Sequence, residues 1–395
     1  MPQGDSEPAI ILGGGGARAA YQVGALRAIA AILGRRGRIP FPVLCGTSAG
    51  AINAAALATE ADDFRRGVAQ LVRWWRRIGV ADVYHGDLGT LSRHGMRFLA
   101  AMTGVGSPPP GAASMLDNAP LATFLQRVAD LDRVRGHVAQ GALTALAINA
   151  TSYDTGQAVS FFEGAAECSP WQRTRRRGER ARLGSDHLMA STAIPFIFPA
   201  VRLAGEYYMD GSVRQITPLS PALHLGARRI FVIGVGQFAG LRAPVKTDPP
   251  PYPSFAQIAG HALSSIFLDN LGADLERLTQ MNRLVDVLPP AKLARKGIRL
   301  AHVDAMMQAP SRDLGPLALA FADRLPAGVR TLLRGFGSTR GTGANLVSYL
   351  LFDRDFCRAL LAEGYRDAMA RRDEIAAFLD GESPQFLPLY MPAGG

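Results

Sequence analysis

The chain has 395 residues, of which 48% are hydrophobic and 19% are charged, a balance that excludes a disordered protein and allows a sizeable core. Lys and Arg outnumber Asp and Glu by 43 to 33, and the net charge of +10 favours anionic partners. Basic and aromatic residues are not interleaved as in nucleic-acid readers, so no nucleic-acid partner is expected. Three scattered cysteines, Cys45, Cys168 and Cys357, exclude a disulfide framework and a zinc site.

Targeting signals are absent from the N-terminal stretch MPQGDSEP, which is polar and has no apolar h-region. The longest apolar runs, such as LGPLALAFA at 314–322, are shorter than the roughly 20 residues that span a bilayer. We therefore expect a cytoplasmic protein without a signal peptide or transmembrane segment, whose contact with membranes is peripheral.

The first elements alternate between short apolar runs and helical spacing. Ala9–Leu12 is predicted as a buried strand, Arg18–Leu33 as a helix, Phe41–Cys45 as a second strand and Ala49–Ala58 as a helix. Further strands are expected at 143–149, 158–162, 201–203, 207–209, 230–235 and 285–288. This alternation predicts an α/β fold with three α/β/α layers around a mostly parallel central sheet.

The domain organisation is predicted from the breaks in this pattern. Segments rich in Pro and Gly at 104–112 and 244–253 are expected to be surface loops. We expect one α/β domain over 8–237, followed by a helical C-terminal extension over 254–380 that packs on the same domain.

A glycine run, Gly13–Gly16, ends the first predicted strand and opens the first helix. Backbone amides in this position are suited to bind a negative group. The run fits the dinucleotide fingerprint G-x-G-x-x-A, with Ala19 as its last residue. That fingerprint also requires an acidic residue or an arginine after the second strand, where this chain has Gly46-Thr47-Ser48. An NADP-binding oxidoreductase remains the alternative that this loop allows.

The second strand is followed by G-x-S-x-G, formed by Gly46-Thr47-Ser48-Ala49-Gly50, and then by a helix of small residues. A serine in a sharp turn between a strand and a helix is typical of a nucleophile elbow. Adjacent parallel strands deliver both turns to one sheet edge, so the amides of Gly14, Gly15, Gly16 and Ala17 are expected near Ser48, as an oxyanion hole.

A base for Ser48 is not provided by any histidine in a strand-end turn. The better candidate is Asp210, which follows the predicted strand 207–209 in EYYMDGSV. A carboxylate acts as a general base when apolar surroundings bring its pKa closer to the working pH. The alternative is an ordinary Asp-Gly turn.

Together, three motifs resemble those of the patatin-like phospholipase family. They are Gly14-Gly15-Gly16-Ala17-Arg18-Ala19, Gly46–Gly50 and Asp210-Gly211-Ser212. The segments 114–125 and 189–213 also resemble family blocks, and the resemblance spans residues 8–237. Two positions depart from the family pattern: Ala19 replaces the usual last glycine, and Ser212 stands where Gly or Ala is commoner.

The resemblance implies a lipid acyl hydrolase of the phospholipase A or lysophospholipase type. Ser48 would be the nucleophile, Asp210 the base of a Ser-Asp dyad, and the glycine loop the oxyanion hole, without a metal or cofactor. The expected partners are a phospholipid or other acyl-ester lipid and a membrane surface, with acidic lipid as one option. A catalytically silent lipid-binding relative is a further alternative, and headgroup and chain-length preference stay open.

Three features keep two interpretations each. Residues 88–106, which include Leu91 and Met96, form either a mobile lid or a helix that packs on the core. The arginine-rich stretch 173–182 is either a site for acidic lipid or a solvated charged loop. Arg18 either anchors the glycine loop or lies near an anionic headgroup.

Overall fold

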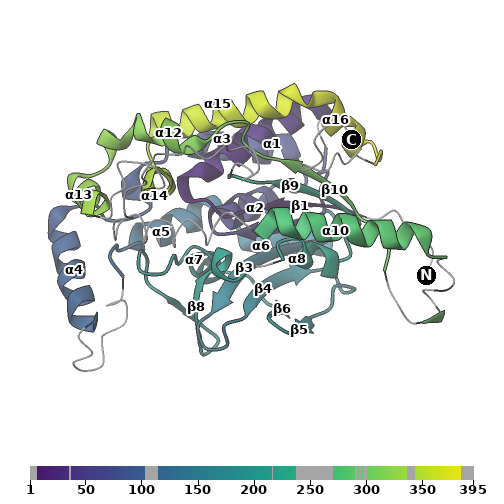
Figure 1. Cartoon of the computed structure of the whole chain (residues 1–395), viewed down its shortest axis with the longest axis horizontal. Helices are drawn as coiled ribbons and strands as arrows, with labels where there is room; N and C mark the ends of the chain where they lie inside the picture. Colours follow the sequence, from purple (N-terminus) through teal and green to yellow (C-terminus); the bar gives the residue numbers. More distant parts are fainter. Residues whose placement is uncertain are drawn as a thin grey trace, which may run out of the picture.

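A mixed ten-stranded sheet forms the centre of the protein (Figure 1), in the order β10-β9-β1-β2-β3-β4-β6-β5, with β8 paired to β3 and β7 to β8. The computed structural model describes residues 7–34, 37–102, 114–215, 217–236, 270–289, 300–335 and 343–383, with 292, 295 and 296. The strands are β1 (Pro8–Leu12), β2 (Val43–Thr47), β3 (Ala145–Ser152), β4 (Ala158–Gly164), β5 (Trp171–Arg173), β6 (Arg176–Arg180), β7 (Val201–Leu203), β8 (Glu206–Asp210), β9 (Arg229–Ile233) and β10 (Asp304–Gln308). The neighbours from β10 to β3 all run parallel.

Helices cover both faces of this sheet. They are α1 (Ala20–Leu33), α2 (Ala49–Thr59), α3 (Phe64–Trp75), α4 (Leu88–Met102), α5 (Ala119–Val128), α6 (Leu131–Ala139), α7 (Ser185–Ser191), α8 (Ser220–His224), α10 (Asn270–Val287), α12 (Leu314–Leu319), α13 (Ala327–Gly335), α14 (Gly343–Leu350), α15 (Arg354–Ala370) and α16 (Arg372–Leu379). Two short 3-10 turns, η1 (Gly16–Ala19) and η3 (Gly211–Val213), carry predicted site residues.

Side-chain alternation along the strands divides the core into two layers. In β1, Ile10 and Leu12 face the cluster that contains α1, α2, α3 and α15, whereas Ala9 and Ile11 face the cluster that contains α8 and α10. The predicted α/β/α arrangement with a mostly parallel sheet is therefore confirmed, with helices in the C-terminal part of the chain. The division into 8–237 and 254–380 stays a prediction.

In the C-terminal part, one predicted strand is wrong and one observed strand has no counterpart in the sequence predictions. Residues 285–288, predicted as a strand, form the end of α10 and the residue after it, because a short apolar run does not distinguish strand from helix. The sheet instead takes β10, whose sequence DAMMQ gave no strand signal. The predicted loops 104–112 and 244–253, and the first part of the helix expected at 254–284, lie outside the described residues.

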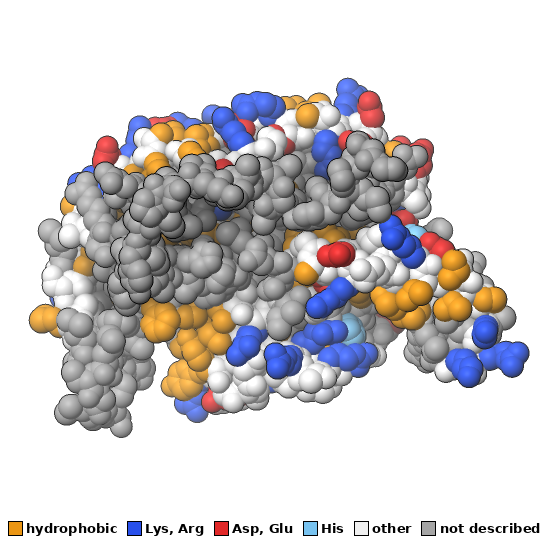
Figure 2. Space-filling view, viewed as in Figure 1, with side chains coloured by type: hydrophobic (Ala, Val, Ile, Leu, Met, Phe, Trp, Pro, Cys, Tyr) orange, Lys and Arg blue, Asp and Glu red, His pale blue; other side chains and the backbone are white. Residues whose placement is uncertain are grey.

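The arginine-rich stretch 173–182 is not a loop. It contributes the end of β5 and all of β6, which pair in antiparallel fashion, and β6 also pairs with β4. Figure 2 shows Lys and Arg side chains gathered over β5, β6 and α8. The alternation of a strand decides which of these arginines face which side of the sheet.

The segment proposed as a lid begins as α4, which projects from one end of the molecule (Figure 1) and contacts α13. Leu91 packs against the core, and the Met96 side chain is 66% exposed. The lid and the packing helix therefore both remain predictions. In the part of the chain that the structure describes, no helix combines the length and apolar character needed to cross a membrane.

Candidate active site

Ser48 occupies the turn between β2 and α2, where its φ of 55° and ψ of −131° lie outside the regions that non-glycine residues prefer. The flanking glycines make this turn possible, because a Cβ at Gly46 would collide with Ala51 and one at Gly50 with the Leu12 carbonyl. The Ser48 amide donates to the Ser191 hydroxyl at 2.8 Å. This strained, tightly held turn is the geometry predicted for a nucleophile elbow.

Asp210 is brought to Ser48 by strand β8, which pairs with the end of β3 so that Asp210 lies opposite Ala150. Its side chain is fully buried. Oδ1 accepts a hydrogen bond of 2.8 Å from the Ser212 amide. Oδ2 is buried and has no partner of full hydrogen-bond geometry among the described residues, although Ser48 lies close enough to act on the carboxyl group.

Burial raises the pKa of Asp210 from its ordinary 3.8 to about 6, and hydrogen bonds from Ser48 and Ser212 oppose the rise. Since catalytic hydrogen bonds are often long or off-line before substrate binds, the Ser48 contact and the unfilled Oδ2 are consistent with each other. The carboxylate therefore has one oxygen held in place and one left to receive a proton.

The glycine loop lies against the Ser48 turn and under α14. A Cβ at Gly14 would collide with the Ser212 hydroxyl and lie 3.1 Å from Ser48 Cβ. The same addition at Gly15 would meet Val235, and at Gly16 it would meet the Tyr349 backbone. Within the described part of the chain, nothing accepts a hydrogen bond from the amides of Gly14, Gly15, Gly16 or Ala17.

Arg18 lies buried beneath the loop and does not face solvent. Its Nε donates to the Ser348 hydroxyl at 2.6 Å, and its guanidinium carbon lies 4.9 Å from the centre of the Tyr349 ring. Ala19 is also fully buried, next to α1. Of the two interpretations of Arg18, these contacts match the anchor.

A hydrogen-bond network supports the Ser48 and Asp210 turns from behind. Thr47 donates to Gln215 Oε1 at 2.6 Å and accepts from Asn149 Nδ2 at 3.1 Å. Ser191, which holds the Ser48 amide, donates to the Asn149 carbonyl at 2.6 Å. A Cβ at Gly211, directly after Asp210, would collide with that same carbonyl.

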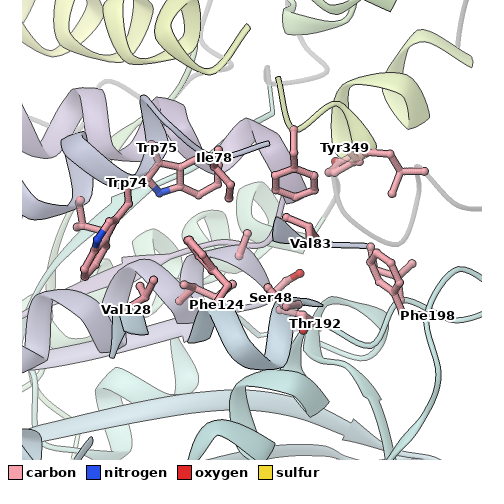
Figure 3. A pocket seen from close by; sticks show the side chains of 18 residues that line it. Ser48, Trp74, Trp75, Ile78, Val83, Phe124, Val128, Thr192, Phe198 and Tyr349 are labelled. Carbon is pink, nitrogen blue, oxygen red and sulfur yellow. The ribbon is translucent and has the colours of Figure 1, made fainter. Parts of the chain in front are cut away.

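An apolar pocket with about 630 Å³ of empty space opens on Ser48. Figure 3 shows Ser48 pointing into it, with Trp74 and Val128 toward one end and Phe198 and Tyr349 toward the other. The remaining walls come chiefly from α2, α3 and α5. Such a lining suits a hydrocarbon chain.

Among the described histidines, the side chains of His137, His187, His224 and His302 form hydrogen bonds with residues other than Ser48 and Asp210. In the described ranges, no group of three or more His, Cys, Asp or Glu side chains is placed to hold a metal ion.

Sequence reasoning did not assign Asn149, Gln215 or Tyr349 to the site. Asn149 lies at the site because β3 pairs with β2 in a register that puts it opposite Thr47. Gln215 lies in the loop after η3. Tyr349 belongs to α14, some 300 residues after Ser48 in the chain. Ser191 was part of the block 189–213 that resembles the family, which was the one available signal for it.

The fold and this site define an α/β protein in which a strained serine opens on an apolar pocket and lies beside a buried aspartate. The family model of patatin-like phospholipase matches residues 10–223, more than half of the chain, and the protein belongs to that family. Its members are lipid acyl hydrolases. A solved structure of VipD from Legionella pneumophila is similar at 12% identity and a TM-score of 0.34, covering 94% of this chain and 67% of that one. No curated protein matches the sequence.

Proposed function

We propose that this protein is a serine lipid acyl hydrolase of the phospholipase A or lysophospholipase type, which works through a Ser48–Asp210 dyad. The observation that carries the proposal is the buried Asp210 carboxylate, whose unpartnered Oδ2 lies beside a serine held in an elbow turn. The apolar pocket that opens on Ser48 supports a fatty-acyl ester as the substrate.

In the first half of the reaction, Ser48 Oγ attacks the ester carbonyl while its proton passes to Asp210 Oδ2. The carbonyl oxygen becomes an oxyanion, which accepts hydrogen bonds from the amides of Gly14, Gly15, Gly16 and Ala17, in the loop that packs against Ser48. Collapse of the tetrahedral intermediate breaks the ester C–O bond. Asp210 returns the proton to the departing alcohol, and the acyl group remains on Ser48.

In the second half, a water molecule replaces the alcohol. Asp210, again ionised, takes a proton from this water as its oxygen attacks the acyl carbonyl. The resulting intermediate releases the fatty acid, and Ser48 recovers its proton from Asp210. One carboxylate thus serves both steps, which requires a pKa between that of an ordinary aspartate and neutrality, as burial provides here.

The test of the dyad uses a fluorophosphonate probe and a dissolved short-chain ester. Wild type is expected to be labelled and to hydrolyse the ester, and Ser48→Ala to lose both properties. Ser152→Ala is the matched control, because Ser152 is also a fully buried serine but bonds to Glu206 outside the site. An unlabelled, inactive wild type, or an active Ser48→Ala, would overturn the proposal.

We also infer peripheral contact with a membrane at the β7–β8 end of the sheet, where Figure 2 shows hydrophobic side chains gathered on the surface. Phe196 is 60% exposed and stands two residues before Phe198, which lines the pocket. Phe196 has a φ of 66°, held by a hydrogen bond from the Met115 amide to its carbonyl. Tyr153 and Tyr207, also exposed, are joined by a backbone hydrogen bond of 2.9 Å.

This inference is tested by comparing two substrates. Phe196→Ser should slow hydrolysis of phospholipid vesicles but leave the rate on a dissolved short-chain ester unchanged. Leu284→Ser, at an exposed leucine of α10, is the control and should change neither rate. Equal rates on vesicles for wild type and Phe196→Ser would contradict the proposed membrane contact.

A further inference from the structure

A second pocket lies behind the Asp210 turn, between β6, α8 and α10, with about 790 Å³ of empty space. It shares no lining residue with the apolar pocket. Its walls carry four arginines, Arg175, Arg176, Arg214 and Arg277. Arg176 is on β6 and Arg175 directly precedes it, in the region where Figure 2 shows Lys and Arg side chains, and Arg277 is on α10.

Because side chains alternate along β6, neighbouring arginines face opposite sides of the sheet and have different partners. Arg177, on one side of β6, forms ion pairs with Glu179 and Glu206. Its neighbour Arg176 lies on the other side and lines the pocket. The structure describes no ion pair for any of the four pocket arginines, so their charges are not neutralised by a carboxylate in contact.

Two hydrogen-bond donors in the pocket lining are buried without an acceptor. They are Arg176 Nε and Gln215 Nε2, neither of which has a partner among the described residues. Gln215 is oriented by its other amide atom, because Oε1 accepts from Thr47. A buried donor without an acceptor is unfavourable, and an oxygen-rich ligand would supply the missing acceptors.

Neutral and acidic neighbours also shape the pocket. Asn149, Ser160 and Thr217 add polar groups, and Trp171 forms an apolar wall stacked on His224 at 4.8 Å. Burial raises the pKa of Asp274, and the positive charges of Arg176 and Arg277 oppose this rise. Asp274 Oδ2 accepts a hydrogen bond of 2.9 Å from the Leu219 amide. Arg176 and Arg277 share this one carboxyl group, and Arg175 and Arg214 add two further positive charges to the pocket lining.

From these observations we propose that the pocket is a binding site for a phosphate monoester dianion, separate from the ester-cleaving site. Guanidinium groups present paired N–H donors that match phosphate oxygens. Arg176 Nε and Gln215 Nε2 supply two donors at the buried end, and Arg175, Arg214 and Arg277 surround the opening with positive charge. The ligand comes either as a dissolved phosphate compound or as the headgroup of a membrane lipid.

Binding is measured in the Ser48→Ala background, so that lipids are not consumed and the result does not depend on the proposed hydrolysis. Calorimetric titration with inorganic phosphate at constant ionic strength should show saturable binding. Arg176→Gln with Arg277→Gln should weaken it about tenfold or more, as expected for lost charge-assisted hydrogen bonds. Arg175→Gln with Arg214→Gln leaves the buried donors in place and should also weaken phosphate binding. This second double variant tests the proposal if the first one does not fold.

The matched control removes the same charge elsewhere, with Arg93→Gln and Arg202→Gln at two exposed positions outside the pocket. This pair should bind phosphate as before. Absence of saturable binding, or an equal loss in the control pair, would overturn the proposal.

Vesicles distinguish the two sources of the phosphate. We compare phosphatidylcholine vesicles that contain phosphatidic acid with vesicles that contain phosphatidylserine at the same surface charge. Preference for phosphatidic acid that disappears in the pocket variants identifies a lipid headgroup. Phosphate binding without that preference identifies a dissolved ligand.

Discussion

Replacing Asp210 by asparagine separates its catalytic role from its effect on stability. Asparagine has the same shape and keeps an oxygen to accept from the Ser212 amide, but it cannot take a proton from Ser48. We expect turnover of a dissolved ester to fall by orders of magnitude. In wild type, kcat/KM should rise with pH through about 6, the pKa that burial gives Asp210, and level off above it.

The same substitution should stabilise the protein, and the magnitude follows from the pKa. Below about pH 4, Asp210 carries its proton in both the folded and the unfolded chain. Between the ordinary pKa of 3.8 and the folded value of about 6, the unfolded chain releases the proton first, so the folded state loses stability as the pH rises. The full difference corresponds to about 3 kcal/mol, which Asp210→Asn should regain above pH 6 and not below pH 4.

Urea unfolding across this pH range, with ester hydrolysis measured in parallel, tests both statements. Glu206→Gln is the control on the same strand. Arg177 lowers the pKa of Glu206, so the ionised Glu206 stabilises the folded protein. Glu206→Gln should therefore lower the free energy of unfolding above the ordinary glutamate pKa, and it should leave the pH midpoint of activity unchanged. A near-normal rate for Asp210→Asn, or a wild-type pH profile without a step near 6, would refute the dyad.

Three further substitutions test the parts around the dyad. Gly14→Ala should reduce kcat for a short-chain ester about a hundredfold, an effect as large as loss of an oxyanion-hole donor. Its Cβ would collide with the Ser212 hydroxyl and press on Ser48, which would displace the Gly14 amide. An unchanged kcat would remove the loop from the mechanism. Arg18→Lys should lower the free energy of unfolding by about 1–3 kcal/mol in urea titrations through the lost bond to Ser348. Val128→Trp should slow cleavage of long-chain esters but not of short-chain ones, since Val128 lies toward one end of the pocket.

The parts of the site that are local in sequence could be predicted, because each is a turn with its own residue requirements. The elbow around Ser48 needs glycine where Ala51 and Leu12 approach, and the glycine loop needs Gly16 at a φ of 54°. Such constraints appear as motifs in a single sequence.

The parts that depend on register or on distant segments could not be predicted. Asn149 reaches Thr47 only because β3 pairs with β2 in the observed register. A stretch of arginines shows no sign of which members face a carboxylate, so Arg177 and Arg176 look equivalent in the sequence although the first is paired and the second is not. The strand β10 was missed because its pairing with β9, and not its own composition, defines it.

The position of the arginine pocket has a consequence for kinetics. The two pockets share no lining residue. Gly211, which lines the arginine pocket, lies in the turn after Asp210, and Asn149, which also lines it, lies on β3 and accepts from Ser191. We therefore expect a lipid whose ester carbonyl lies at Ser48 to leave the arginine pocket empty. Inorganic phosphate should leave the KM of a dissolved short-chain ester unchanged, whereas competitive inhibition would show that the arginines line the substrate's own headgroup site. Any effect of phosphate on kcat is expected to pass through Gln215, which bonds to Thr47 directly before Ser48, and to disappear in Gln215→Leu.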